Sequence, residues 1–242
     1  MSKTGYIAFD LGAESGRTIL AVLRDARLTI KEINRFQNRP LHLPSGDHWD
    51  LFGIWNHLIE GLRLAGKESR LTGIELASLG VDTWGVDFGL LGQSGQLLCL
   101  PYTYRDPRHQ TGMDQALRKL DKKTIYEATG IHFFPFNTLY QLISLSGTDP
   151  HLLQSARHML NMPDLFHYFF TGKAVNESTI ASTTQMCDPH THDWNKTLLT
   201  RLEIPSHFLS DQIDPGMEIC NLNMFDDRTL QNAKLIHYLS FS

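Results

Sequence analysis

The stretch Phe9-Asp10-Leu11-Gly12-Ala13-Glu14-Ser15-Gly16-Arg17 decides the fold of this chain. It joins two short apolar runs, residues 6–9 and 18–23, whose β-branched and aromatic residues predict buried strands. The two runs and their connection therefore predict a β-hairpin. Two residues are enough to close a hairpin, so this longer turn, which carries two glycines, should leave several backbone amides without a strand partner.

Unpaired amides in such a turn can form an anion site. Converging N–H groups make a concave site, and glycines let a phosphate approach the backbone without a Cβ in the way. Asp10 stands beside that site, at the end of the first strand. A carboxylate next to a phosphate is repulsive unless a cation lies between them, and Mg²⁺ binds carboxylates, waters and phosphate oxygens. The stretch predicts a nucleotide triphosphate loop with Asp10 facing the metal; an ordinary glycine-bearing hairpin is the alternative.

Composition and charge are those of an ordinary globular protein. Of 242 residues, 41% are hydrophobic and 20% are charged, which fits one large domain or two small ones. The net charge of −4 gives no general attraction to nucleic acid or to an acidic membrane, so we expect neither as a partner. Cys99, Cys187 and Cys220 lack metal-ligand spacing and predict reduced thiols. Without a signal region or a membrane-length apolar run, we expect a cytoplasmic location.

Further elements follow the hairpin in a clear order. Residues 28–36 predict a third antiparallel strand, and residues 37–47, with two prolines, predict a loop. Apolar residues between 51 and 62 have helical spacing, and Asp50 is placed to cap that helix. Residues 74–81 predict a buried strand. Later helices are expected over residues 113–120, 137–145 with an Asn cap, 163–170 and 196–202.

The strand over residues 74–81 runs directly into Asp82-Thr83-Trp84-Gly85-Val86-Asp87-Phe88-Gly89. Two carboxylates, an exposed indole and two glycines at a strand end are poor core material but suit a ligand site. Sugar hydroxyls need acceptors such as Asp82 and Asp87, and the C–H face of a sugar packs well on a ring such as Trp84. The run therefore favours a sugar site, with a solvated turn between two strands as the alternative.

Five motifs then occur in the order in which a known family carries them. They are Asp10-Leu11-Gly12-Ala13-x-Ser15-Gly16-Arg17, Gly80-Val81-Asp82-Thr83-Trp84-Gly85-Val86-Asp87-Phe88, Tyr104-Arg105-Asp106-x-Arg108, Phe134-Pro135-Phe136-Asn137-Thr138-Leu139-Tyr140-Gln141-Leu142 and Met162-Pro163-Asp164. Together they resemble the N-terminal half of the FGGY carbohydrate kinases, most closely the rhamnulokinase group. The resemblance begins at residue 5, ends near residue 216 and is far more specific than any single motif.

The resemblance implies an α/β fold. Residues 1–216 would form an actin-like, ribonuclease-H-like ATPase domain with a mixed sheet flanked by helices, followed by a tail, residues 217–242, that does not match the family. ATP and Mg²⁺ would be the cofactors, Asp10 would face the metal, and the reaction would phosphorylate the primary hydroxyl of L-rhamnulose. The ATP phosphates would be held by Ala13, Glu14, Ser15, Gly16 and Arg17, and the sugar pocket would be lined by Asp82, Trp84, Gly85, Tyr104 and Asp106.

The sequence also departs from the family pattern. Members continue into a Gly-x-His-Asp segment, whose aspartate takes the proton from the sugar hydroxyl, and then into a second actin-like lobe. The printed sequence contains neither, so we expect no catalytic base within it. The pair His192-Asp193 is no substitute, because it precedes a surface helix in a region that family members also possess.

Two classes of function remain open from the sequence. One is a sugar kinase represented by its N-terminal half, which would need a complementing C-terminal polypeptide and could use another ketose such as xylulose or fuculose. The other is a catalytically inactive module that binds sugar or nucleotide, or a remnant of one. Binding measurements with sugar and with Mg-ATP separate the two.

Overall fold

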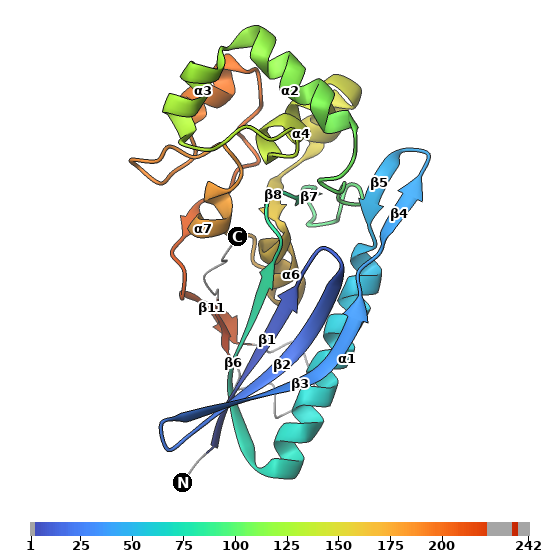
Figure 1. Cartoon of the computed structure of the whole chain (residues 1–242), viewed down its shortest axis with the longest axis vertical. Coiled ribbons are helices and arrows are strands. Elements are labelled where there is room, and N and C mark those ends of the chain that lie inside the picture. Colours follow the sequence, from blue (N-terminus) through green and yellow to red (C-terminus); the bar gives the residue numbers. More distant parts are fainter. Residues whose placement is uncertain (1–2, 222–233, 237–242) are drawn as a thin grey trace.

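A six-stranded mixed sheet is the centre of the computed structural model, which describes residues 3–221 and 234–236 (Figure 1). The strand order is β11-β12-β6-β1-β2-β3. β1, β2 and β3 are antiparallel to one another, whereas β6 runs parallel to β1 and β12 runs parallel to β6. The bounds are β1 Lys3–Leu11, β2 Ser15–Arg24, β3 Arg27–Gln37, β6 Ile74–Thr83, β11 Glu218–Asn221 and β12 Lys234–Ile236.

The predicted hairpin is confirmed, but its strands are longer and its turn is shorter than predicted. β1 and β2 stay paired as far as Asp10 opposite Arg17 and Leu11 opposite Gly16, so only residues 12–14 form the turn. A hydrophobicity pattern does not predict these strand ends, because Asp10 and Arg17 are polar. Opposite charges on directly facing residues nevertheless stabilise a strand pair. The predicted third strand is confirmed as β3.

The segment predicted as a loop over residues 37–47 is instead a second hairpin, and that prediction was wrong. β4 (Pro40–Leu43) pairs with β5 (Gly46–Trp49). Pro40 stands at the first position of β4, where a missing N–H does no harm to the ladder. Prolines normally interrupt strands, so their presence concealed two short strands.

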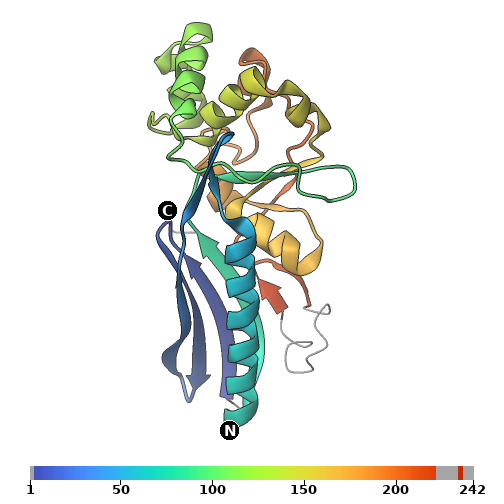
Figure 2. The same cartoon turned by 90° about the vertical axis from the view of Figure 1, so that its right-hand side faces the viewer.

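One long helix, α1 (Leu51–Thr72), runs along the sheet (Figure 2). It begins as predicted, since Asp50 Oδ1 accepts from the amide of Gly53 at 3.0 Å, and it ends at Gly73 with a left-handed φ of 64°. Its apolar face and the helix α6 (Met162–Thr171) cover the same side of the sheet. Trp55 of α1 contacts Phe170 of α6 at 4.6 Å between centroids, and Phe170 stacks on Phe9 of β1.

A second group of helices lies beyond the carboxyl ends of β1 and β6 (Figure 1). Its members are α2 (Arg108–Lys119), α3 (Lys122–Thr129), α4 (Thr138–Thr148), α5 (Pro150–Ser155), α7 (Ser178–Ser182) and α8 (Lys196–Arg201). The helices predicted over residues 113–120, 137–145, 163–170 and 196–202 are thus confirmed as α2, α4, α6 and α8. Asn137 is the N-cap residue of α4, as predicted, but its side chain does not cap the helix, because Nδ2 donates instead to His132 O and Gln185 Oε1.

Two hydrophobic cores result, and a short ribbon separates them. The lower core lies between the sheet, α1 and α6, and the upper core lies among the second group of helices. The ribbon consists of β7 (Phe88–Leu91) and antiparallel β8 (His158–Asn161). Alternate side chains of the ribbon enter different cores: Phe88, Leu90 and Met159 lie in the upper one, Leu91 and Leu160 in the lower one. A further pair, β9 (Asn176–Glu177) and β10 (Gln212–Ile213), is parallel.

Three other expectations concern the whole chain. All three cysteines are free, as predicted. Among the residues described, no helix has the length and apolar character needed to cross a bilayer. The domain boundary at residue 216 stays a prediction: β11 and β12 join the sheet, and the rest of the predicted tail, residues 222–233 and 237–242, lies outside the described residues.

Candidate functional site

The turn between β1 and β2 is closed by specific hydrogen bonds. Gly12 N donates to Ser15 O at 2.8 Å. Asn38, which follows β3, donates its backbone N–H to Glu14 O at 2.9 Å and its side-chain amide to Gly12 O at 3.1 Å. Within the described chain the amides of Ala13 and Glu14 have no acceptor, whereas Ser15 lies within β2. Two outward amides, fewer than the sequence suggested, are therefore available to an anion.

The two glycines of the motif, Gly12 and Gly16, occupy positions with different steric surroundings. A Cβ on Gly12 would lie 3.3 Å from Ser15 O, at the tip of the turn. A Cβ on Gly16 would lie 2.3 Å from the ring of Phe36, inside the lower core. Gly16 is therefore required by packing between β2 and β3, which the sequence could not distinguish from a role in phosphate approach.

Two acidic residues are neighbours at the carboxyl ends of β1 and β6. The strand register places Asp10 directly opposite Arg17 on one side and beside Asp82 on the other. Arg17 binds Asp10 Oδ2 through Nε at 2.7 Å and Nη2 at 2.6 Å, and both side chains are about two-fifths exposed. A carboxylate at a strand end beside a phosphate site is a ligand that Mg²⁺ takes, so Asp10 fits the ion named by the sequence.

The turn after β6 is strained and firmly held. Val86 has a φ of 68°, in the left-handed region that β-branched residues avoid. Its carbonyl accepts from Thr138 Oγ1 at 2.6 Å and from Gln141 Nε2 at 3.2 Å. Strain of this kind persists only where the surroundings fix it, and it gathers at ligand sites. Nothing in the sequence indicated it, because valine is a poor residue for a positive φ.

Asp87 accepts four hydrogen bonds and is 1% exposed. Oδ2 receives the indole N–H groups of Trp49 at 2.7 Å and Trp84 at 2.9 Å and the backbone N–H of Tyr104 at 3.1 Å. Oδ1 receives Gln141 Nε2 at 2.8 Å. Burial raises the pKa of Asp87 to about 6, although all four hydrogen bonds act in the opposite direction. The expectation that Asp87 is free to accept sugar hydroxyls is therefore corrected, as is the expectation of an exposed indole at Trp84, which is half-buried.

Aromatic rings extend from this carboxylate towards the surface. The ring centroids of Trp49 and Trp84 are 4.2 Å apart, Trp49 and Tyr104 are 6.2 Å apart, and Tyr104 and Phe136 are 5.9 Å apart. Phe134 stacks on Phe136 at 4.8 Å and ends the row with 43% of its surface exposed. The structure thus brings the predicted site residues Trp84 and Tyr104 together through Trp49, which the sequence analysis missed.

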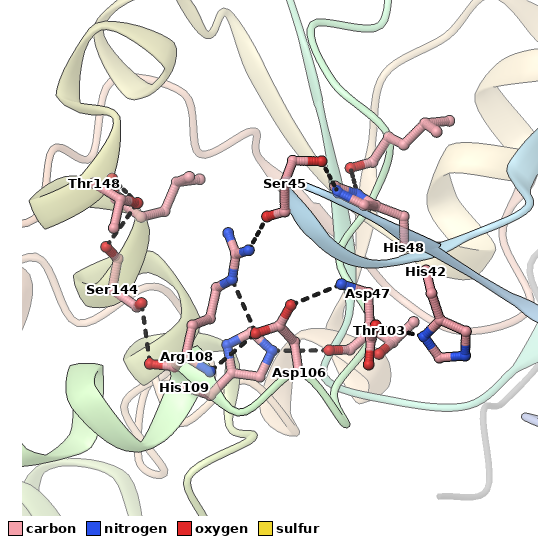
Figure 3. Close-up of polar contacts among 12 residues, drawn as sticks. His42, Ser45, Asp47, His48, Thr103, Asp106, Arg108, His109, Ser144 and Thr148 are labelled. Atoms are coloured by element: carbon pink, nitrogen blue, oxygen red, sulfur yellow. Dashed lines mark hydrogen bonds and ion pairs between the residues drawn. The ribbon is translucent and has the colours of Figure 1, made fainter.

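Asp106, the other predicted pocket residue of this loop, links two elements (Figure 3). Oδ2 accepts from Asp47 N of the β4–β5 hairpin at 2.9 Å, and Oδ1 accepts from Arg108 N at 2.9 Å and Nε at 3.0 Å. Burial acts to raise the pKa of Asp106, but these hydrogen bonds outweigh it and hold the pKa below its ordinary value. Arg108 also donates to Ser45 O and lies over the ring of Tyr102. The contacts of Asp106 are thus with protein donors, and its role towards a sugar stays a prediction.

The predicted phosphate turn and the predicted sugar pocket lie next to each other. Arg105 Nη2 is 3.8 Å from Glu14 Oε1 at the tip of the turn, and its Nε donates to the hydroxyl of Tyr104 at 3.2 Å. Gly85 lies in the strained turn between Trp84 and Val86. His192, by contrast, is exposed in a turn with a φ of 58°. The fold therefore joins the two halves of the candidate site and leaves His192 on the surface.

Known proteins resemble this chain along nearly its whole length. Rhamnulokinase from Pectobacterium atrosepticum is 42% identical over 223 residues, which are 91% of this chain and 44% of that protein. Rhamnulokinase from Yersinia pestis (strain Pestoides F) is 43% identical over 215 residues, 88% of this chain and 44% of that protein. The chain thus spans less than half the length of these curated relatives.

Solved structures show the same fold. A ligand-bound xylulose kinase from Lactobacillus acidophilus matches with a TM-score of 0.85 at 18% identity, over 98% of this chain and 48% of that one. A gluconate kinase from the same organism matches with a TM-score of 0.86 at 18% identity, over 99% and 48%. The predicted α/β fold, a single actin-like lobe with a mixed sheet flanked by helices, is confirmed. Residues 5–224 match the N-terminal domain of the FGGY family of carbohydrate kinases, and the chain belongs to that family.

Proposed function

We propose that this chain is the N-terminal lobe of an ATP-dependent sugar kinase that phosphorylates the primary hydroxyl of L-rhamnulose. The observation that carries the proposal is the 3.8 Å contact between Glu14 and Arg105, which itself bonds Tyr104, because the turn with unpaired amides and the aromatic row are therefore neighbours. Phosphoryl transfer depends mainly on positioning and on charge stabilisation, so a phosphate site next to a sugar site is its minimal requirement. The names of the relatives support rhamnulose over xylulose, fuculose or gluconate.

The chain's own residues divide between two tasks. Ala13 to Arg17 would hold the ATP phosphates, chiefly through the amides of Ala13 and Glu14 and the guanidinium of Arg17. Asp10 would face Mg²⁺, which neutralises phosphate charge when bound. Arg17, which binds Asp10 in the structure, carries a guanidinium of the kind that also binds phosphate oxygens, so it would be the cationic group of the phosphate site.

The sugar would lie on the other side of the turn. Asp82 would accept its hydroxyls, Trp84 and Tyr104 would pack against its C–H face, and Gly85 would leave room for it. Asp106 would act from the edge of this pocket by holding the loop that carries Tyr104. No residue is assigned as general base. That group, with the second lobe, would come from a complementing C-terminal polypeptide, and the complex would act in the cytoplasm.

Two measurements test the proposal. Calorimetric titration of the chain with Mg-ATP and, separately, with L-rhamnulose, L-fuculose and D-xylulose should show Mg-dependent nucleotide binding and strongest sugar binding to L-rhamnulose. ADP release with L-rhamnulose should then require a polypeptide that carries the Gly-x-His-Asp segment. Binding without ADP release in the mixture would indicate a non-catalytic module, and binding of neither ligand would leave only a remnant.

A further inference from the structure

Donors from four segments meet at the carboxylate of Asp87. Its donors come from β5, from the turn after β6, from the loop before α2 and from α4. These positions are far apart in sequence, since Trp49 precedes Asp87 by 38 residues and Gln141 follows it by 54. Two of the donor residues, Trp84 and Tyr104, are among those predicted to line the sugar pocket. The geometry of that pocket therefore depends on one buried acceptor.

Two indoles share a single oxygen atom, which fixes how they pack. An indole has one hydrogen-bond donor and no acceptor, so its N–H direction sets the ring orientation. Because the N–H groups of Trp49 and Trp84 both point at Asp87 Oδ2, the rings are held 4.2 Å apart at an angle of 44°. A buried indole N–H that lost this acceptor would remain unsatisfied, at a free-energy cost that favours a different ring position.

The donors around Asp87 require an acceptor at both oxygens of the side chain. A carboxylate accepts on both oxygens, whereas the amide of asparagine accepts on one and donates from the other. With its oxygen facing the three donors at Oδ2, an asparagine would turn its NH₂ towards Gln141 Nε2. Gln141 cannot rotate its amide without loss, because Nε2 also donates to Phe136 O at 2.8 Å and Val86 O at 3.2 Å.

In the described part of the chain, the groups that contact Asp87 are all neutral. They are two indoles, one backbone amide and one side-chain amide, and Asp87 forms no ion pair there. Burial raises its pKa to about 6, so the carboxylate is still mostly ionised at pH 7. The four donors are thus what stabilises the buried charge, and any loss of one must be felt by the others.

We propose that Asp87 is a positioning residue for sugar specificity: it does not touch the substrate, and it orients Trp84 and the Tyr104 loop, which do. The inference rests on the proposed function for the identity of the ligand. It differs from the direct role that Asp87 would have as an acceptor of sugar hydroxyls. It also assigns Trp49, Gln141 and the backbone of Val86, which has a strained φ, to one hydrogen-bonded group behind the pocket.

Asp87→Asn is the sharpest probe, and Asp164→Asn is its matched control. Asp164 of α6 is also a fully buried carboxylate, and it accepts from Asn161 Nδ2 and from Glu177 N, two donors that are not part of the aromatic row. For both variants of the full chain, near-UV circular dichroism reports the packing of the indoles, and calorimetry gives the Kd for L-rhamnulose and for Mg-ATP. Gln141→Met, which removes the donor to Oδ1 together with the hydrogen bonds of Gln141 to Phe136 O and Val86 O but leaves the two indoles their acceptor, is a second variant in case Asp87→Asn does not fold.

The proposal makes a selective prediction. Asp87→Asn should lose near-UV indole signal and weaken L-rhamnulose binding about 10- to 100-fold, with the Kd for Mg-ATP unchanged. Gln141→Met should change the near-UV signal and the Kd for L-rhamnulose in the same direction but by a smaller factor. Asp164→Asn should change neither the near-UV signal nor the Kd for L-rhamnulose. Sugar affinity equal to the unsubstituted chain, or equal losses of sugar and nucleotide affinity, would overturn the inference.

Failure of the proposed function is distinguishable from failure of this inference. If the unsubstituted chain binds no L-rhamnulose, the proposed sugar is wrong, and the indole signal alone decides the role of Asp87. Loss of that signal in Asp87→Asn but not in Asp164→Asn would then support the positioning role. Retention of the signal in Asp87→Asn would exclude it.

Discussion

Replacing Val86 with glycine should be unusually well tolerated by the fold and poorly tolerated by the site. The φ of 68° at Val86 is strained for a β-branched residue and natural for glycine. The turn is nevertheless held by hydrogen bonds to the carbonyl, from Thr138 and Gln141, that a glycine would keep. The side chain of Val86 is only half-buried, so its removal leaves no large cavity.

The expected magnitude follows from three terms. The left-handed region costs a residue other than glycine roughly 1–2 kcal/mol, which the substitution removes. Against this, the more flexible glycine stabilises the unfolded chain by about 0.4–1 kcal/mol. The folded state also loses about 0.7–1 kcal/mol of packing by the half-buried valine side chain. The terms nearly cancel, so the free energy of unfolding should change by less than about 1 kcal/mol.

Val22→Gly is the matched control. Val22 is also half-buried, but it lies in β2 opposite Thr29 with ordinary extended geometry, so its replacement relieves no strain. That variant should lose about 2 kcal/mol, from the same entropy and packing terms and the weaker strand. Urea denaturation of both variants measures the difference, and calorimetry should show weaker L-rhamnulose binding by Val86→Gly because its turn is looser. Equal destabilisation of the two variants would refute the claim that strain is stored at Val86.

Three further predictions concern charge and packing. Because burial raises the pKa of Asp87 from 3.8 to about 6, the folded state binds more protons than the unfolded state between these pH values. Lowering the pH from 7 to 4 should therefore raise the unfolding free energy of the unsubstituted chain, relative to that of Asp87→Asn, by roughly 1–3 kcal/mol. Urea titrations in which both proteins show the same pH dependence would contradict this. Asp10→Asn breaks an exposed ion pair, so stability should change by less than about 1 kcal/mol, whereas calorimetry should show that ATP binding no longer depends on Mg²⁺; retained dependence would exclude Asp10 as the ligand. Gly112→Ala would place a Cβ 2.0 Å from Tyr140 O and force α2 away from α4, at a cost of about 2–4 kcal/mol in stability. Gly73→Ala, which meets no atom within 4 Å but has a φ of 64°, should cost only about 1–2 kcal/mol. Similar melting temperatures for the two variants would contradict the close approach of α2 to α4.

Local sequence patterns predicted most of the helices and strands. The alternation of Ile7, Phe9 and Leu11 in β1 and the helical spacing in α1 are properties of short stretches, so the hairpin and the helix were predictable. The β4–β5 hairpin was not, because Pro40 is a usual sign of a loop and each strand is only four residues long. The end of β1 was missed for a different reason: Asp10 is kept in the ladder by Arg17, a partner that a hydrophobicity pattern does not register.

The site was predictable in its components and not in its connections. The order of motifs located Asp10, Trp84 and Tyr104, and the fold places these segments together. What each atom does depends on residues distant in sequence, as Asp87 shows: a carboxylate at a strand end was expected to face a ligand, yet Trp49 and Gln141 enclose it. The residues assigned to ATP, metal and sugar therefore remain predictions, and binding experiments decide them.

The ribbon of β7 and β8 has a consequence for how the molecule comes apart. Since its alternate side chains divide between two interiors, either interior can open while the other keeps its own set of buried contacts. Amide hydrogens of α1 and those of α4 should then exchange with solvent by separate openings of different free energy. A compound that bound both the β1–β2 turn and α4 would couple those openings, and the convergence of the two exchange rates would reveal its binding without any reaction.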